Sequence, residues 1–190
     1  MSKILYVSDL LDIDLIGGGE LNDAELCLQL VKNNHNVSKI RSHMLTASQC
    51  KDYDFIVVSN FVNMQKLVLD FIRDNCKYMI YEHDHKYLIN RNPAIFENYK
   101  APTEYIINKK LYQNAKSVFC QSSFHKEIIE KNLGINNVYN VSGNLWSEKS
   151  LSLISDLSTD NESKDSKISI LNSNTQHKNT KECVFYCEKK

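Results

Sequence analysis

The densest cluster of titratable side chains is Tyr81-Glu82-His83-Asp84-His85, which closes an apolar run. In an extended chain His83 and His85 point one way, and Glu82 and Asp84 point the other. Imidazole titrates near neutrality and a carboxylate can orient it, which suits acid–base chemistry. A His-x-His pair could also begin a metal site, and a solvated polar turn is the alternative without chemistry. We expect a functional role, because open α/β sheets bind ligands at the carboxyl ends of their strands.

A glycine cluster at 17–19 separates an apolar run at 3–9 from a helical pattern at 20–31. Glycine lets backbone N–H groups approach an anion or a sugar closely, and a helix N-terminus adds partial positive charge. The alternative is a loop that only needs positive φ angles. A phosphate-binding P-loop is excluded because Glu20 and Leu21 stand where Lys and Ser/Thr are required. A nicotinamide site is disfavoured because Asn22 replaces the last glycine of that fingerprint.

The segment 86–96 is long for a connection in such a fold, and long ordered loops at this edge often bind substrate. Lys86 and Arg91 could meet a phosphate or a carboxylate, whereas Tyr87 and Phe96 could stack on a sugar. Surface charge without function is the alternative for each cation. His125, which begins a later helical pattern, is expected to face the same edge.

Short apolar runs alternate with helical patterns along most of the chain. The predicted strands are 3–9, 37–42, 54–60, 77–83, 117–122 and 137–142, and the predicted helices are 20–31, 64–74, 102–114 and 123–133. Leu67, Val68, Phe71 and Ile72 share one helical face, Phe124 is expected to point inward with Ile128 and Ile129, and Gly134 is placed to cap the last helix. Continuous apolar strands alternating with helices predict a doubly wound parallel α/β sheet.

The alternation stops at a polar stretch, 155–166, which is typical of an exposed linker. A new strand is predicted at 167–173, followed by a polar loop and a helix from 179. We therefore expect a domain at 1–154, a linker at 155–166, and at 167–190 the start of a truncated second α/β domain. The alternative is a strand and helix that fold back onto the first sheet.

The composition limits the classes of partner. The chain has 23 Lys and Arg against 23 Asp and Glu, so no overall basic field attracts nucleic acid or a membrane surface. An apolar run of about 20 residues, as a membrane span needs, is absent, and so is a signal-peptide core. These features predict a soluble, cytoplasmic protein. The six cysteines are expected to be reduced, and Cys183, Cys187 and His177 do not complete a four-ligand zinc site.

Together these segments resemble two-domain glycosyltransferases of the GT-B type, especially the large retaining group. The resemblance rests on the segments 3–7, 18–21, 115–123, 140–144 and 167–178, and on the histidine that closes the fourth strand. It implies that Gly18, Gly19, Glu20 and Lys178 bind the donor, and that His83 touches the transferred sugar near the reacting carbon. Asp84, His85 and Arg91 are the acceptor-side candidates.

The resemblance also implies a nucleotide-diphosphate sugar as donor substrate, with neither metal nor cofactor. Two departures stand out: Ser173 and Asn174 lie near the place of an expected arginine, and the paired-glutamate motif that holds the nucleotide sugar is missing. Complete members are about twice as long, so the chain is expected to be an N-terminal half that is inactive alone. The alternatives are a non-catalytic sugar- or nucleotide-binding module, and a phage-type enzyme that glycosylates DNA bases, which the balanced charge disfavours.

Overall fold

The computed structural model describes residues 1–14, 17–159, 169–170 and 179–188. The chain divides into two compact units, Met1–Ser147 and Glu148–Lys190, and each is described by itself. The first unit contains the strands β1 (Lys3–Ser8), β2 (Asn36–Arg41), β3 (Phe55–Val58), β4 (Tyr78–Tyr81), β5 (Val118–Cys120) and β6 (Val138–Asn140). Its helices are α1 (Gly18–Lys32), α2 (Ala47–Cys50), α3 (Lys66–Asn75), α4 (Lys109–Asn114) and α5 (Ser123–Leu133).

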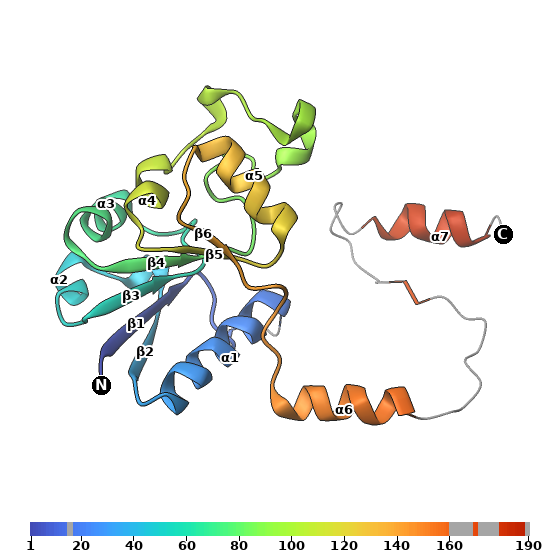
Figure 1. Ribbon diagram of the computed structural model, residues 1–190, viewed down its shortest axis with the longest axis horizontal. Coiled ribbons are helices and arrows are strands. Elements are labelled where there is room, and N and C mark those ends of the chain that lie inside the picture. Colours follow the sequence, from blue (N-terminus) through green and yellow to red (C-terminus); the bar gives the residue numbers. More distant parts are fainter. Residues whose placement is uncertain (15–16, 160–168, 171–178, 189–190) are drawn as a thin grey trace. The chain divides into compact units, whose positions relative to one another are not determined.

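The six strands form one parallel sheet in the order β2-β1-β3-β4-β5-β6 (Figure 1). The predicted doubly wound α/β sheet is therefore confirmed, and each structural strand overlaps one of the predicted apolar runs. The chain moves from β1 to β2 on one side and then returns to place β3 on the other side of β1. This reversal creates a switch point, and ligands of open α/β sheets bind at the carboxyl ends beside it.

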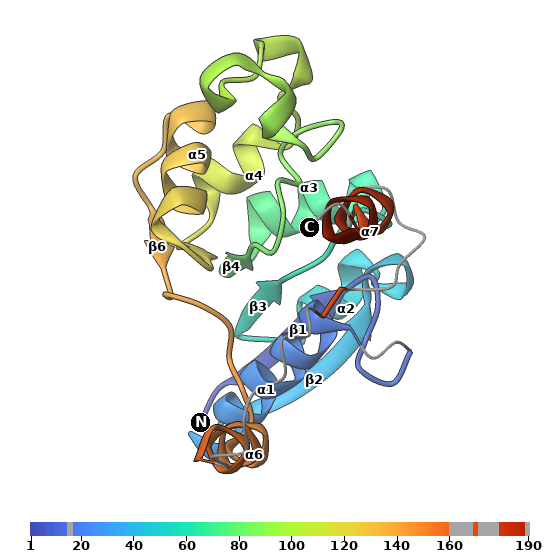
Figure 2. The same ribbon diagram turned by 90° about the vertical axis from the view of Figure 1, so that its right-hand side faces the viewer.

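Helices cover both faces of the sheet (Figures 1 and 2). Helix α1 packs Cys27, with Leu26 and Leu30, against the face that carries Ile4, Tyr6, Val57 and Tyr81. The larger core lies on the opposite face, where α3, α4 and α5 bury side chains such as Ile72, Tyr112 and Ile129. Burial on both faces explains why the central strands β1, β3, β4 and β5 are apolar at nearly every position, whereas the edge strand β2 is mostly polar and has no buried residue.

Two helices differ in detail from the predicted faces. In α3 the buried residues are Val68, Leu69 and Ile72, whereas Leu67 is 81% exposed. In α5 Phe124 is 54% exposed and does not point inward, although Ile128 and Ile129 are buried as predicted. The buried stripe of α3 was therefore misplaced by one residue, whereas in α5 only Phe124, in the first turn, was assigned wrongly. Gly134 caps α5 with a φ of 64°, as predicted.

The predicted helix 102–114 is wrong in its first half. A 3-10 turn at Thr103–Tyr105 is followed by Asn108 in a left-handed conformation with φ 55°, and only then does α4 begin. Residues 82–108 instead form an ordered connection with two further 3-10 turns, Pro93–Ile95 and Glu97–Tyr99. A single antiparallel bridge between Leu88 and Ile106 pins this connection to itself. The connection therefore starts and ends beside the carboxyl end of β4.

The second unit contains α6 (Glu148–Thr159) and α7 (Thr180–Glu188). Helix α6 covers 155–159, so this part of the predicted linker is helical, and the rest of the linker lies outside the described residues. Leu151, Ile154 and Leu157 recur at helical spacing in α6, which is the signal that the polar composition obscured. The truncated second domain remains a prediction. Within the described residues, none of the helices has the length and apolar character needed to cross a membrane.

Candidate functional site

Polar side chains from the carboxyl ends of three strands converge on one buried carboxylate, Asp23 of α1. The hydroxyl of Ser59, directly after β3, donates to it at 2.9 Å, and the hydroxyl of Ser8 at the end of β1 donates at 3.3 Å. The Nε2 atom of His83, which follows β4, lies 2.6 Å from the Asp23 Oδ1 atom. The site therefore lies across the switch point, where β1 and β3 are neighbours.

A second contact fixes the His83 ring from its other side. The amide nitrogen of Gln121, just after β5, donates to His83 Nδ1 at 3.1 Å and to Asn144 Oδ1 at 2.5 Å. An Nδ1 atom that accepts a hydrogen bond leaves the proton on Nε2, which then donates to Asp23. The His83 ring is thus held from both sides, and the Tyr81 ring packs edge-on against it with centroids 4.7 Å apart. One of its two hydrogen bonds must be exchanged before the ring can take part in proton transfer.

Asn22 links α1 to β4 and to the segment that follows β6. Its side-chain amide donates to the Tyr81 hydroxyl at 2.9 Å, and its carbonyl oxygen accepts from the Leu145 backbone N–H at 2.6 Å. Asn22 is 1% exposed. The same helix that supplies Asp23 therefore also anchors the segment after β6, which brings Asn144 within reach of Gln121.

The predicted donor-binding glycines lie in the first turn of α1 rather than in a loop. Gly17 is the N-cap with φ −125° and ψ 166°, and no side chain caps this helix end. The alternative that the cluster needs positive φ angles is wrong for Gly18 and Gly19, because both are helical. A Cβ atom built on either residue meets nothing within 4 Å. The first-turn N–H groups, including that of Glu20, thus have the geometry that suits an anion.

Glu82 and Lys86 form a buried ion pair on the opposite side of the chain from His83. The Lys86 Nζ atom lies 2.8 Å from Glu82 Oε1 and 2.9 Å from Asp84 Oδ1, and the Tyr112 hydroxyl donates to the second Glu82 oxygen. Burial alone would lower the pKa of Lys86, but the carboxylates of Glu82 and Asp84 outweigh it and raise that pKa. Burial, reinforced by Glu82, raises the pKa of Tyr112 well above its ordinary value. This cluster holds the start of the 82–108 connection in place.

His85 does not lie beside His83, which corrects the predicted alternation. Strand β4 ends at Tyr81, so the two-residue period stops before the cluster begins. The His85 ring packs on His125 of α5 with centroids 4.5 Å apart, and its Nδ1 atom lies 2.9 Å from the Tyr87 hydroxyl. Burial, aided by the neighbouring His125, lowers the pKa of His85 to about 4. Burial also lowers the pKa of His125.

Several residues of the 86–96 segment are less accessible than predicted. Lys86 and Tyr87 are buried, and the Phe96 ring packs on Tyr105 with centroids 5.0 Å apart. Tyr87 and Phe96 are therefore not placed to stack on a sugar. Arg91 is different, because half of its side chain is exposed and it contacts Asp84 at 3.4 Å.

The predicted site residues thus fall into separate groups. His83 lies at the switch point on the face that α1 covers, whereas Asp84, His85 and Arg91 lie along the connection after β4. Lys178 is outside the described residues. Within the part of the chain that the structure describes, no three His, Cys, Asp or Glu residues are grouped as a metal site would require.

The sequence analysis missed the His83 partners Asp23 and Gln121, and it missed Ser59, which donates to Asp23. Ser59 and Gln121 each directly follow an apolar strand, so the sequence could have predicted their positions at the carboxyl edge of the sheet. Asp23 gave a weaker signal, because a carboxylate within an amphipathic helix is usually a solvated residue.

Comparisons with known proteins place this fold in context. No family model matches the chain, and no curated protein matches it. Among solved structures it is similar to an alpha-glucosyltransferase in complex with UDP and a 13-mer DNA containing a HMU base, with 14% identity, 73% of this chain and 41% of that chain covered, and a TM-score of 0.48. It is also similar to an alpha-glucosyltransferase (AGT) in complex with UDP, with 15% identity, 74% and 43% covered, and a TM-score of 0.48.

A short-chain flavodoxin is a further match, with 15% identity, 80% of this chain and 88% of that chain covered, and a TM-score of 0.34. At these identities the similarity concerns the fold. Two of these matched structures are glycosyltransferases, the class that the sequence resembles. The chain spans less than half the length of the glucosyltransferase structures that it matches.

Proposed function

We propose that this chain is the acceptor-side part of a glycosyltransferase that uses a nucleotide-diphosphate sugar as donor. The observation that carries the proposal is the fixed Asp23–His83 pair at the switch point, with a 2.6 Å separation between the carboxylate oxygen and the ring nitrogen. An imidazole held by two hydrogen bonds is a positioned polar group that can contact a sugar hydroxyl once one of these bonds is exchanged. The uncapped first turn of α1 supports the proposal, because it supplies N–H donors for a diphosphate.

In this proposal each group has one role. The backbone N–H groups of Gly18 and Gly19 and the positive end of α1 stabilise the charge that develops on the leaving diphosphate. His83 contacts the transferred sugar, while Asp23 and Gln121 act as positioning residues. Asp84, His85 and Arg91 belong to the acceptor side, with His85 half-buried against His125. A second domain, with Lys178 as one of its donor contacts, would enclose the site and strengthen these electrostatic interactions.

Two alternative functions can be distinguished from this proposal by experiment. A non-catalytic nucleotide-binding module is favoured by one observation, namely that both ring nitrogens of His83 are engaged. An enzyme that glycosylates DNA bases would need to hold the phosphate backbone, and the balanced charge of this chain argues against a large basic surface. Salt-dependent retention of the chain on immobilised DNA would support that second alternative.

The test is a titration of the isotope-labelled chain with UDP-glucose, GDP-mannose and UDP at millimolar concentration, followed by backbone NMR shifts. We expect at least one sugar nucleotide to shift the amide signals of Gly18 and Gly19. The signal of Gly134 should stay unchanged, because this glycine caps α5 and lies outside α1 and the His83 cluster. No shift at Gly18 and Gly19 with any of the ligands would contradict the proposal.

His83→Gln separates sugar contact from nucleotide contact. We expect the variant to bind the sugar nucleotide more weakly than the parent but to bind UDP equally well, because only the sugar meets the ring. The matched control is His43→Gln, since His43 is an exposed residue outside the cluster. Equal loss of UDP and of sugar-nucleotide binding would assign His83 to the scaffold.

We also expect no sugar transfer by the chain alone, and robust transfer by a monomer would refute the half-enzyme interpretation.

A further inference from the structure

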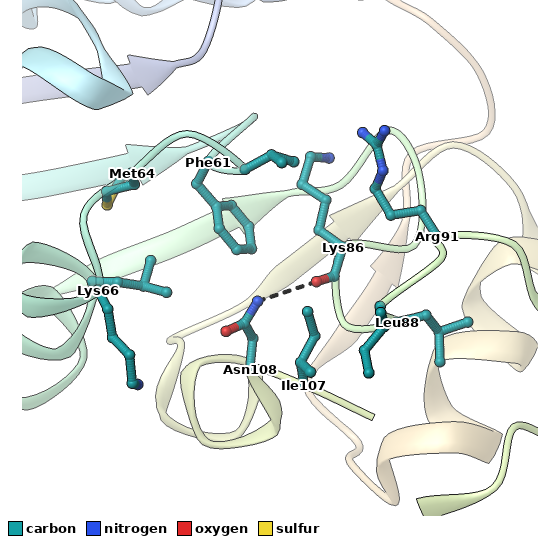
Figure 3. Close-up of a pocket in the computed structure, with 11 residues that line it drawn as sticks. Phe61, Met64, Lys66, Lys86, Leu88, Arg91, Ile107 and Asn108 are labelled. Atoms are coloured by element: carbon teal, nitrogen blue, oxygen red, sulfur yellow. Dashed lines mark hydrogen bonds between the residues drawn. The ribbon is translucent and has the colours of Figure 1, made fainter. Parts of the chain in front are cut away.

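A pocket of about 210 Å³ opens beside the carboxyl ends of β3 and β4, apart from the His83 cluster (Figure 3). Its walls come from the segment after β3, from the first turn of α3, and from both ends of the connection after β4. The connection is held closed behind it, because Ile107 N–H donates to the Tyr87 carbonyl at 2.8 Å and Asn108 donates to the Lys86 carbonyl at 3.2 Å. The pocket is therefore built by ordered chain segments.

The walls of the pocket are mainly apolar. Phe61 and Leu88 are buried within it, whereas Val62, Ile89 and Ile107 are exposed by 52%, 61% and 39%. Large apolar side chains that gather around one cavity and face water are typical of a ligand site rather than of an ordinary surface. The apolar part of a ligand would cover these three side chains.

The charged side chains on one side of the pocket are cations, of which Lys86 is already paired with Glu82 and Asp84, so Arg91 is the group left for a ligand anion. Lys86 and Arg91 both line the pocket, both contact the same carboxylate of Asp84, and none of the lining residues is acidic. The Arg91 contact is long at 3.4 Å and exposed to solvent, so it is weak and can be exchanged for a ligand anion. Arg91 also adopts a left-handed backbone conformation with φ 52°, which is uncommon for a non-glycine residue and is often found at binding sites.

The volume limits the size of the ligand. A cavity of about 150 Å³ is enough for benzene, and each water occupies about 30 Å³ in the liquid. The pocket of about 210 Å³ therefore has room for one aromatic ring and a small anionic group. We propose that it binds an aromatic ring that carries a carboxylate or a phosphate, as the acceptor-recognition subsite of the transferase proposed above. The assignment of the subsite to an acceptor rests on that proposed function, but the ligand chemistry does not.

The test measures binding of phenyl phosphate, benzoate, benzyl alcohol and inorganic phosphate to the chain by NMR shifts. We expect phenyl phosphate or benzoate to bind at least about 10-fold more tightly than either benzyl alcohol or inorganic phosphate, the scale of one charge-assisted hydrogen bond. The relative affinities of phenyl phosphate and benzoate show whether the pocket prefers a phosphate or a carboxylate. If neither phenyl phosphate nor benzoate bound more tightly than inorganic phosphate, the proposal would be overturned, because the apolar wall would then contribute nothing.

Two variants locate the site. Arg91→Met should lower the affinity for the aromatic anion by about 10-fold, and Ile89→Ser should also lower it, since both change exposed side chains in the pocket. The matched controls are Arg41→Met, which alters an exposed arginine on β2, and Ile95→Ser, which alters an isoleucine that is 62% exposed outside the pocket. Unchanged affinity in Arg91→Met and Ile89→Ser would refute the assignment. These results do not depend on donor binding at α1, so the two proposals can fail separately.

Discussion

Replacing the buried Glu82 carboxylate should destabilise the first unit more than any surface change. Glu82 is fully buried and the Lys86 side chain is 2% exposed, so neither charge has water as a substitute partner. At 2.8 Å and an effective dielectric constant of about 20, the gross attraction between the two charges is about 6 kcal/mol. Removing one partner of such a pair typically costs about 3–5 kcal/mol, and the lower end applies here because Asp84 still contacts Lys86 at 2.9 Å. We expect Glu82→Gln to lower the free energy of unfolding by that amount.

Urea denaturation of the single and double variants tests this reasoning. Lys86→Met should also lower the free energy of unfolding, because it removes the cation that both Glu82 and Asp84 contact. The double variant Glu82→Gln/Lys86→Met should lose less than the sum of the two single variants, by about 2 kcal/mol or more. Glu130→Gln is the matched control, because Glu130 and Lys126 have the same i,i+4 spacing but are partly exposed and 3.6 Å apart. It should cost less than about 1 kcal/mol. An effect of Glu82→Gln as small as the control, or additive single effects, would refute the argument.

Two further predictions concern stability. The pKa of His85 falls from 6.5 to about 4, chiefly through burial, so the unfolded chain takes up a proton that the folded chain excludes. The free energy of unfolding should therefore decrease by about 3 kcal/mol as the pH falls from about 6.5 to about 4. In urea titrations at several pH values, His85→Gln should flatten this pH dependence. The same pH dependence in His85→Gln as in the parent would contradict this assignment to His85. Gly18→Ala should raise the free energy of unfolding by about 0.5 kcal/mol, because the backbone is helical and the new Cβ meets no neighbour. Gly134→Ala should lower it by about 1 kcal/mol, because φ is 64° there; thermal unfolding that gave both variants the same sign would count against this explanation.

Apolar runs were sufficient to predict the sheet, because strands buried on both faces are apolar at nearly every position. The same signal overestimated their length. The run that closes β4 was predicted to reach His83, but the strand ends at Tyr81. Beyond that point Glu82 turns to Lys86 and Tyr112, while His83 turns to Asp23. Side-chain alternation applies only to residues that pair with a neighbouring strand, so it could not predict the directions of the side chains from Glu82 to His85.

The partners of His83 were hard to predict for a different reason. Asp23 lies 60 positions before His83 and 36 before Ser59, and its burial depends on how α1 lies across β1 and β3. A helical period identifies the buried stripe but not the polar donors that meet it. The pocket beside Arg91 was also beyond the sequence, because its walls join residues near 61 to residues near 107.

The strand order also bears on how the chain folds while it is being made. Each strand after the first pairs with a strand that precedes it in the sequence: β2 and β3 with β1, β4 with β3, β5 with β4, and β6 with β5. In a chain that emerges from the ribosome N-terminus first, only β1 therefore has to wait for a later strand before it can pair. From β3 onward the growing edge of the sheet is always the newest strand. Among the described residues β6 is the last strand of the sheet, and its three residues offer little backbone for another chain to pair with.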